Sequence, residues 1–272
     1  MKVARTIADL HAALPGPTGR ADIGLVPTMG AFHAGHQSLF DAARGECATV
    51  VVSLFVNPIQ FGAGEDLERY PRDEAADISA AGSSGVDILF VPDAAEIYPH
   101  GFDTWVDPGV LGSVLEGAVR PGHFRGVATV CLKLFHLVRP RRAYFGRKDA
   151  QQVAVIRALL RDLDLASETE LRVLPTVRDD DGLAVSSRNA YLSPEQRQQA
   201  LALPRALRAG LAAHQAGGDA AGATWAVLTP APGIEVDYVA VADLDGPTLA
   251  AAVRIGATRL IDNVLLSGED AG

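Results

Sequence analysis

The chain has 272 residues, 48% of them hydrophobic, so it is too long for one small domain and can bury the cores of two. Its net charge of −9 excludes a broad nucleic-acid-binding surface, because phosphate backbones are bound by basic surfaces. The longest apolar run, residues 48–56, is far shorter than the ~20 residues of a membrane span, so we expect no membrane contact and a cytoplasmic protein.

The first predicted elements are a helix, a strand and a second helix. Thr6 followed by Asp9 resembles a capping box that opens a helix. The apolar run 23–26 then indicates a strand that ends at Pro27. A periodic segment typical of a helix begins at about Gln37.

The loop within residues 26–39 is the strongest functional signal. A loop at the carboxyl edge of a strand in an α/β sheet faces small ligands, and its N–H groups together with the next helix dipole suit an anion. His33 and His36 lie three apart across Gly35, so both imidazoles can face one bound group. We interpret this stretch as a nucleotide-binding loop.

Plainer interpretations of these histidines remain open at this point. An H-x-G-H tetrapeptide is short enough to occur by chance, and two histidines near a helix start are often capping or packing residues. Zinc is disfavoured, because no Cys or Glu stands at the ligand spacings of zinc proteins.

Amide side chains follow the next predicted strand. Residues 48–56 are rich in β-branched side chains and predict a central parallel strand. Asn57 and Gln60 come at its end, at the same edge of the sheet as the histidine loop, and can present amides to a polar substrate. An ordinary turn is the alternative. A helix over 73–81, stopped by Gly82, and a third strand over 86–91 complete a βαβαβ unit.

Cations surround the next two predicted elements. After an irregular stretch, Arg120 and Arg125 precede an apolar helix over 127–138, where they are either surface charges or anion contacts. A short strand over 143–145 then leads through residues 146–152 into a helix ending near residue 163.

Two polar segments in this part of the chain suit phosphate. Lys148 and Asp149 are typical of a phosphate-binding cation beside an orienting acid, although a solvated helix start is the alternative. A fifth strand over 171–177 leads into a loop whose Ser186, Ser187 and Arg188 form a second plausible phosphate clamp.

The last part of the chain has a different character. Ser193 followed by Pro194 predicts the start of a helix that runs to about residue 209. Apolar runs at 234–241 and 253–266 suggest a small antiparallel sheet. We therefore predict an α/β fold in which residues 1–176 form a parallel-sheet domain and residues 177–272 a smaller α+β domain.

Six motifs in this order resemble the pantothenate synthetase family, the pantoate-β-alanine ligases. They read P-T-M-G-A-F-H-A-G-H, F-V-N-P-I-Q-F-G, R-Y-P-R, R-P-G-H-F-R-G-V-A-T-V, F-G-R-K-D-A-Q-Q and S-S-R-N. The resemblance implies a Rossmann-like nucleotidyltransferase domain with a C-terminal lid, usually in a homodimer. It also implies that (R)-pantoate and β-alanine are joined with ATP through a pantoyl adenylate, releasing AMP and pyrophosphate, with Mg²⁺ on the phosphates.

The resemblance also implies roles for individual residues. His36 is the proton donor and His33 its partner on the phosphates, while Lys148 and Arg188 add positive charge. Pantoate is contacted by Gln60, near the β-alanine entrance, and by Gln152. The residues implied to bind ATP are Met29, Gly30, Ala31, Phe32, His33, Ala34, Gly35, His36, Gly146, Arg147, Lys148, Asp149, Val177, Val185, Ser186, Ser187 and Arg188.

No protein ligand of Mg²⁺ is assigned, and Asp77 is only a candidate outer contact. Three positions depart from the usual pattern of the family: Arg147 stands where Glu is commoner, Val185 where Met or Leu is usual, and Phe32 where Leu is usual. None of these changes removes a residue that the chemistry needs.

Two other functions compete with this interpretation. One is a related ligase that joins a different acid or amine, and the other is a nucleotide-binding regulator without turnover. The acidic composition and the lack of an anticodon-binding domain argue against a tRNA substrate. The intact pair of histidines with Lys148 and Arg188 argues against a regulator, since binding alone would not require every charge of the transition state.

Overall fold

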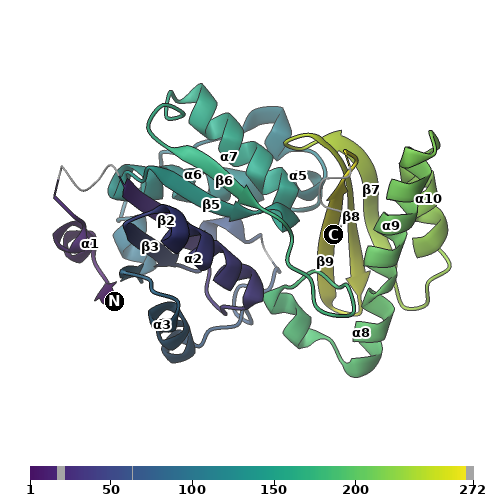
Figure 1. Cartoon of the computed structure of the whole chain (residues 1–272), viewed down its shortest axis with the longest axis horizontal. Helices are drawn as coiled ribbons and strands as arrows, with labels where there is room; N and C mark the ends of the chain where they lie inside the picture. Colours follow the sequence, from purple (N-terminus) through teal and green to yellow (C-terminus); the bar gives the residue numbers. More distant parts are fainter. Residues whose placement is uncertain (17–21, 63, 268–272) are drawn as a thin grey trace. The chain divides into compact units, whose positions relative to one another are not determined.

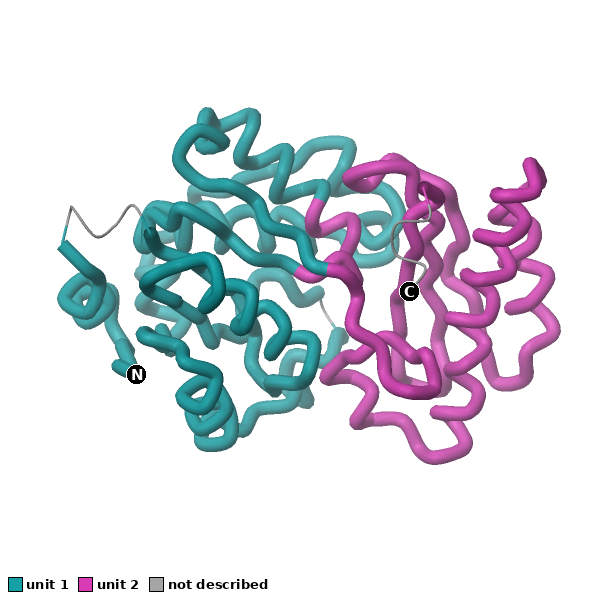
Figure 2. The backbone as a smooth tube through the Cα atoms, in the orientation of Figure 1, with its two compact units in different colours: residues 1–145, 154–174 teal, residues 146–153, 175–272 magenta. Residues whose placement is uncertain are grey.

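The computed structural model describes residues 1–16, 22–62 and 64–267, so the last five residues of the predicted C-terminal domain lie outside the described part (Figure 1). The chain divides into two compact units. Unit 1 comprises Met1–Phe145 and Ala154–Leu174, and unit 2 comprises Gly146–Val153 and Pro175–Gly272 (Figure 2).

Unit 1 is built on a six-stranded sheet with the order β1-β4-β3-β2-β5-β6. Its strands are β1 (Lys2–Ala4), β2 (Ile23–Thr28), β3 (Thr49–Leu54), β4 (Ile88–Phe90), β5 (Arg142–Gly146) and β6 (Glu170–Leu174). Parallel ladders join β1 to β4, β4 to β3, β3 to β2 and β2 to β5. Starting from β2, the chain adds β3 and β4 on one side and β5 and β6 on the other. The order therefore reverses between β2 and β5, and ligands bind at the carboxyl ends of the strands at such a switch point.

Helices cover this sheet on both faces. The helices of this part of the chain are α1 (Ile7–Ala13), α2 (Ala34–Glu46), α3 (Glu74–Ser83), α4 (Ala94–Ile97), α5 (Glu116–Val119), α6 (His123–Val138) and α7 (Ala150–Asp162), the last of which starts in unit 2. The short 3₁₀ turns of unit 1 are η2 (Pro58–Gln60) and η3 (Gly109–Gly112), whereas η4 (Arg147–Asp149), between β5 and α7, belongs to unit 2. Phe40 of α2 and Ala81 of α3 pack on Val50 and Leu89 of the sheet, whereas α6 contacts β2 and α1. The covered parallel sheet confirms the predicted α/β class.

Unit 2 is an antiparallel sheet packed on helices. The order β7-β8-β9 joins β7 (Glu235–Asp243), β8 (Pro247–Ile255) and β9 (Thr258–Leu265). The helices are α8 (Pro194–Ala200), α9 (Ala202–Gln215) and α10 (Ala220–Leu228), with the 3₁₀ turn η5 at Ser187–Tyr191. Leu203 and Leu207 of α9 share a buried core with Leu249 and Val253 of β8. At the closest approach of α9 to α10, a Cβ on Gly210 would lie 2.2 Å from Thr224 Oγ1.

Two predicted helix starts in unit 1 were wrong. Helix α2 begins at Ala34 rather than near Gln37, because His33 is its N-cap, which places His36 in the first turn. Helix α6 begins at His123 rather than at Val127.

Several other predicted ends also need correction. Helix α3 continues through Gly82 to Ser83, because the left-handed turn that ends it is at Gly85, with φ of +73°. Strand β2 runs through Pro27 to Thr28, and β6 ends at Leu174, before Val177. The three-residue strand β1 was not predicted at all.

The predicted C-terminal elements were too few. The single helix expected from Pro194 is two helices that break at Leu201, because Pro204 has no N–H to bond the carbonyl of Ala200. The two apolar runs belong to three strands, since the alanine-rich start of β8 carries a weak strand signal. Within the described ranges, no helix combines the length and the apolar character that crossing a membrane requires.

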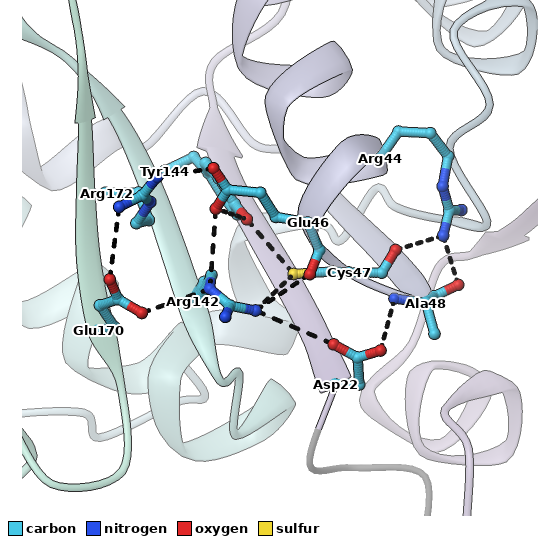
Figure 3. A network of polar contacts seen from close by, with 9 residues as sticks. All are labelled: Asp22, Arg44, Glu46, Cys47, Ala48, Arg142, Tyr144, Glu170 and Arg172. Atoms are coloured by element: carbon cyan, nitrogen blue, oxygen red, sulfur yellow. Dashed lines mark hydrogen bonds and ion pairs between the residues drawn. The ribbon is translucent and has the colours of Figure 1, made fainter.

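A polar network ties the C-terminal end of α2 to the start of β5 and β6, at the edge of the sheet away from the histidine loop (Figure 3). The Glu46 carboxylate accepts hydrogen bonds from Tyr144 Oη at 3.0 Å and from Arg172 Nη2 at 2.7 Å. Arg142 donates to the Glu46 carbonyl at 3.0 Å and pairs with Glu170 at 3.3 Å. The hydrogen bond from Arg172 is the main cause that lowers the pKa of Glu46 below its ordinary 4.5.

We predict that Glu46→Gln lowers the free energy of unfolding at neutral pH by about 1 kcal/mol, a modest value because the side chain of Glu46 is 31% exposed. The folded-state pKa is depressed, so this stabilisation is present above pH 4.5 and is lost as the pH falls through the lower folded value. Urea unfolding at neutral pH and near pH 3 measures both effects. Asp162→Asn, in an exposed ion pair with Arg161, is the control. An equal stability difference at both pH values would contradict the prediction.

Candidate active site

Asp77 of α3 determines the backbone of the loop that follows β2. Its Oδ2 accepts a hydrogen bond from Ala31 N at 2.9 Å and its Oδ1 one from Phe32 N at 2.8 Å. Ala31 has a φ of +52°, which is unfavourable for an alanine. Gly30 has a φ of +87°, and a Cβ there would lie 2.8 Å from Asp77 Oδ2. The loop is therefore folded around one buried carboxylate, which the sequence had suggested only as an outer contact to Mg²⁺.

His33 and His36 form a capping box at the start of α2. His33 Nδ1 accepts from Gly35 N at 3.2 Å, and His33 N donates to His36 Nδ1 at 3.3 Å. The ring centroids are 4.1 Å apart. Because Nδ1 is the acceptor in both rings, the proton of each neutral ring is assigned to Nε2. The histidines do cap the helix, and this role fixes the tautomer in which Nε2 can donate to an anion.

Small and aromatic neighbours hold the two rings in place. A Cβ on Gly35 would lie 3.0 Å from His33 Cε1, so a side chain there would displace the ring. Phe32 packs against His36 at 5.4 Å between centroids and edge-on against Phe40 at 5.1 Å. Phe32 thus connects the ring of His36 to Phe40 in the core of α2.

Gln60 is brought to the same loop by neighbouring amide and thioether groups. Its Nε2 lies 3.0 Å from Met29 Sδ, and its Oε1 accepts from Asn57 Nδ2 at 3.0 Å. Asn57 also donates to the Gly126 carbonyl at 3.2 Å and accepts from Tyr98 Oη at 2.9 Å. Both ends of the buried Asn57 amide are thus used within unit 1, where they orient Gln60.

Helix α6 fixes the main chain of Gln60. A Cβ on Gly126 would lie 2.7 Å from the Ile59 carbonyl oxygen, so only glycine allows this close packing. His123 Nδ1 donates to the Gln60 carbonyl at 2.9 Å, and Arg120 Nη1 donates to His123 Nε2 at 3.2 Å. Burial, followed by the nearby charge of Arg120, lowers the pKa of His123 to about 4.

The sequence left open whether Arg120 and Arg125 are surface charges or contacts to an anion, and the structure gives each of them a partner within the protein. Arg120 forms a two-point ion pair with Glu65, at 3.0 and 2.6 Å. Arg125 lies inside α6, where its guanidinium stacks over Trp105 at 4.1 Å from the ring centroid. Both cations therefore have partners within unit 1.

In unit 2, the turn after β5 carries the predicted phosphate cation. Lys148 lies in η4, with its Nζ 3.8 Å from Asp149 Oδ1. Arg147 Nη1 lies 3.6 Å from Asp245 Oδ2, and both side chains are largely buried. Arg147 thus has an acidic neighbour that offsets its charge. Gln152 is partly exposed in the first turn of α7.

The second predicted phosphate segment is a hairpin closed by main-chain hydrogen bonds. Val185 N donates to the Val177 carbonyl at 2.9 Å, so these two predicted ATP contacts lie together. Ser186 Oγ accepts from Arg188 N at 3.3 Å and caps η5, and Asn189 Nδ2 donates to the Ala184 carbonyl at 3.0 Å.

The predicted site residues therefore fall into two groups. Unit 1 brings together the histidine loop, Asn57 and Gln60, and unit 2 holds the Lys148 turn, Gln152 and the Ser186–Arg188 segment. Sequence reasoning missed the positioning roles of His123 and Tyr98. The only available signal was a polar side chain beside an apolar helix or loop, which does not identify its partner.

Comparisons with known proteins agree on one family. The family described as Pantoate-beta-alanine ligase matches residues 2–265. A pantothenate synthetase of Acidobacterium capsulatum is 51% identical over an alignment of 294 positions, which covers 98% of this chain and 97% of that protein. A pantothenate synthetase of Roseiflexus sp. (strain RS-1) is 52% identical over an alignment of 283 positions, which covers 98% of this chain and 99% of that protein.

Solved structures are similar over the same length. Pantothenate synthetase from Thermus thermophilus has a TM-score of 0.92 and 46% identity, covering 98% of this chain and 99% of that one. Pantoate-beta-alanine ligase from Francisella tularensis, complexed with beta-gamma ATP and beta-alanine, has a TM-score of 0.85 and 35% identity, covering 98% of each chain.

The neutral state of His123 predicts a pH dependence of stability. The folded pKa of about 4 lies below the ordinary 6.5, so the unfolded chain binds the proton first and stability falls as the pH drops from 6.5 towards 4. Because the ring keeps some exposure, we expect a loss of about 2 kcal/mol across this window. The His123→Gln variant cannot titrate at this position, so its free energy of unfolding should fall less over the same pH range. Urea unfolding at several pH values tests this, and equally steep profiles for both proteins would contradict it.

Proposed function

Since the chain belongs to the pantoate-β-alanine ligase family, we propose that it joins (R)-pantoate to β-alanine with ATP through a pantoyl adenylate, releasing AMP and pyrophosphate. The observation that carries the proposal is the capped histidine loop at the switch point of the sheet. There, two imidazoles whose Nδ1 atoms both accept main-chain hydrogen bonds present Nε2 as the donor, and together with the dipole at the start of α2 they suit a phosphate group.

The first half-reaction requires positioning and positive charge. A pantoate carboxylate oxygen attacks the α-phosphorus of ATP, the bond to the bridging oxygen breaks, and pyrophosphate leaves with the electron pair. Little covalent chemistry is required of the protein in phosphoryl transfer. We propose that His33 and His36 donate through Nε2 to the phosphoryl oxygens, and that Lys148 and Arg188 neutralise the charge that develops there.

Mg²⁺ is proposed to arrive on ATP as part of the substrate. Within the described residues, no group of three or more His, Cys, Asp or Glu side chains could hold a metal ion. Mg²⁺ keeps several waters and is commonly bound through substrate phosphates with one or two carboxylates, so the metal would come with ATP.

The second half-reaction requires a neutral amine and protection from water. The β-alanine amine attacks the acyl carbon, the bond to the AMP oxygen breaks, AMP leaves with the electron pair, and the nitrogen loses one proton as the amide of pantothenate forms. Because an acyl adenylate hydrolyses readily, water must be excluded. We propose that Ser186, Ser187 and Arg188 contribute to this exclusion as part of a lid.

The amide side chains are proposed to recognise pantoate. Gln60 and Gln152 offer donors and acceptors to its hydroxyl and carboxylate groups, and Asn57 holds Gln60 in place. The remaining ATP contacts are proposed to come from the 29–36 loop, residues 146–149, Val177 and Val185. A homodimer, as is usual in the family, is proposed as well, and light scattering on the purified chain tests it.

Exchange of labelled pyrophosphate into ATP tests the proposed function. With Mg²⁺ and pantoate but without β-alanine, exchange is expected, because adenylate formation is reversible. Adding β-alanine should then release AMP and form pantothenate. A folded chain that binds ATP but shows no pantoate-dependent exchange would contradict the proposed substrate, and a panel of other small hydroxy acids would identify a related ligase.

Lys148→Ala should lower the rate of adenylate formation about 10²-fold, because one charged donor to the transition state is removed. The pantoate-dependent exchange rate is the measurement, and circular dichroism checks the fold. Lys133→Ala, whose Nζ lies 5.2 Å from the centre of the Phe102 ring, is the matched control and should keep its activity. A folded Lys148→Ala protein with an unchanged exchange rate would rule out the assigned role.

Asp77→Asn should lower kcat/KM for ATP about 10- to 100-fold, because an amide can accept from only one of the two loop N–H groups and the histidines would shift. Asp73→Ala in the same helix removes only the N-cap bond to Ala76, so it should cost about 1 kcal/mol of stability and leave kcat/KM unchanged. Steady-state kinetics beside thermal unfolding separates the two effects. Loss of stability without loss of kcat/KM in Asp77→Asn would show that the loop does not depend on this carboxylate.

A further inference from the structure

Two buried polar residues stand next to each other in β9 of unit 2. Asp262 is 2% exposed and Asn263 is 5% exposed. Successive side chains of a strand point to opposite faces, so the two residues reach different segments of the chain. These two segments are the ones that carry the predicted phosphate contacts of unit 2.

Asn263 holds the Lys148 turn through its main chain. Its Nδ2 donates to the Arg147 carbonyl at 3.0 Å and to the Lys148 carbonyl at 2.8 Å. Two carbonyl acceptors fix the orientation of the amide, because the flipped amide would set its oxygen against both of them. The backbone that carries Lys148 is therefore anchored from a strand more than a hundred residues away in sequence.

Asp262 holds the hairpin that leads to Arg188. Its carboxylate accepts from Arg178 Nη1 at 2.6 Å and Nη2 at 3.0 Å, and Arg178 also donates to the Gly182 carbonyl at 3.2 Å. Arg178 forms a bridge with Ala184, directly before Val185 and the Ser186–Arg188 segment. The ion pair thus fixes the hairpin to β9.

The main chain links these two anchors. Asn263 N donates to Asp262 Oδ1 at 2.8 Å, and the Asn263 carbonyl lies 3.4 Å from Arg178 Nη2. A displacement of β9 at this point would therefore move the Lys148 turn and the hairpin together. Apolar residues could fill the same volume, but they would not fix the register of two polar loops.

We propose that the Asp262-Asn263 pair is the positioning element that sets the Lys148 turn and the Arg178–Arg188 hairpin in register for the phosphates of ATP. The inference rests on the proposed function, because it assigns those segments to ATP. Neither residue is assigned a contact with substrate, and both act through the segments they hold. Misplacing a reacting group by about 1 Å can cost on the order of 100-fold in rate, so such an anchor has a kinetic effect beyond stability.

Asn263→Asp tests the proposal with almost no change in volume. The carboxylate cannot donate and repels both carbonyl oxygens, so kcat/KM for Mg·ATP should fall about 10- to 100-fold while KM for β-alanine changes less than about twofold. Asp262→Asn weakens the ion pair with Arg178, so it should lower kcat/KM for Mg·ATP by a smaller factor, again with little change in KM for β-alanine.

Asp237→Asn is the matched control in the same sheet. Asp237 accepts from Arg254 at 3.1 Å and from Arg259 at 2.6 Å, and neither arginine belongs to the two phosphate segments. Asp237→Asn should lower the thermal midpoint and leave kcat/KM for Mg·ATP unchanged. If Asn263→Asp does not fold, Asn263→Ser, which keeps one donor, takes its place in the same comparison.

The rise in thermal midpoint caused by Mg·ATP is the second readout, since it depends on ATP binding alone. We expect a smaller rise in Asn263→Asp than in the wild type and in Asp237→Asn. Equal rises in thermal midpoint and equal kcat/KM values for Mg·ATP in both variants would overturn the inference and leave Asn263 a structural residue. A wild-type chain that is stabilised by Mg·ATP but makes no pantothenate would instead contradict the proposed function.

Discussion

The carboxylate of Asp77 is the interaction on which the histidine loop depends. It binds two consecutive N–H groups and so stabilises an alanine in the left-handed region, a conformation that costs of order 1–3 kcal/mol. That turn delivers the chain to His33 in the extended conformation an N-cap requires. The cap then sets the tautomers of both imidazoles. The histidine loop follows β2, whereas Asp77 lies in α3, which follows the neighbouring strand β3. The proposed chemistry at the loop thus depends on a helix from the next strand of the sheet.

The same arrangement recurs in both units: a residue assigned to substrate is held by hydrogen bonds from polar side chains that are themselves given no contact with substrate. Gln60 is held by Asn57 through its amide and by His123 through its carbonyl. In unit 2, Lys148 is held through its carbonyl by Asn263. Asn57 uses both ends of its amide within the protein, and Asn263 uses its Nδ2 on two carbonyl oxygens, so these groups add rigidity to the segments they hold. Preorganised donors stabilise a transition state without reorganisation at the moment of reaction.

Much of the fold was visible in the sequence because local patterns determined it. The β-branched run of β3, the capping box at Thr6 and the proline after Ser193 were read correctly. The start of α2 was placed too late, because histidine is not among the preferred N-cap residues and its role depends on a loop held by Asp77. The pairing of Arg120 with Glu65 also escaped prediction, because the two residues are 55 positions apart. A sequence shows which residues can carry charge, and tertiary contacts decide which of them are already paired.

The proposed role of the histidine loop is chemistry at the α-phosphorus of ATP, and an isotope can follow that step. Pantoate labelled with ¹⁸O in its carboxylate is incubated with the chain, Mg·ATP and β-alanine, and the products are analysed by mass spectrometry. If the carboxylate attacks the α-phosphorus, one ¹⁸O atom stays on phosphorus when the amide forms, so labelled AMP is predicted. Label in inorganic phosphate, or unlabelled AMP beside newly formed pantothenate, would contradict the adenylate and with it the role given to His33 and His36.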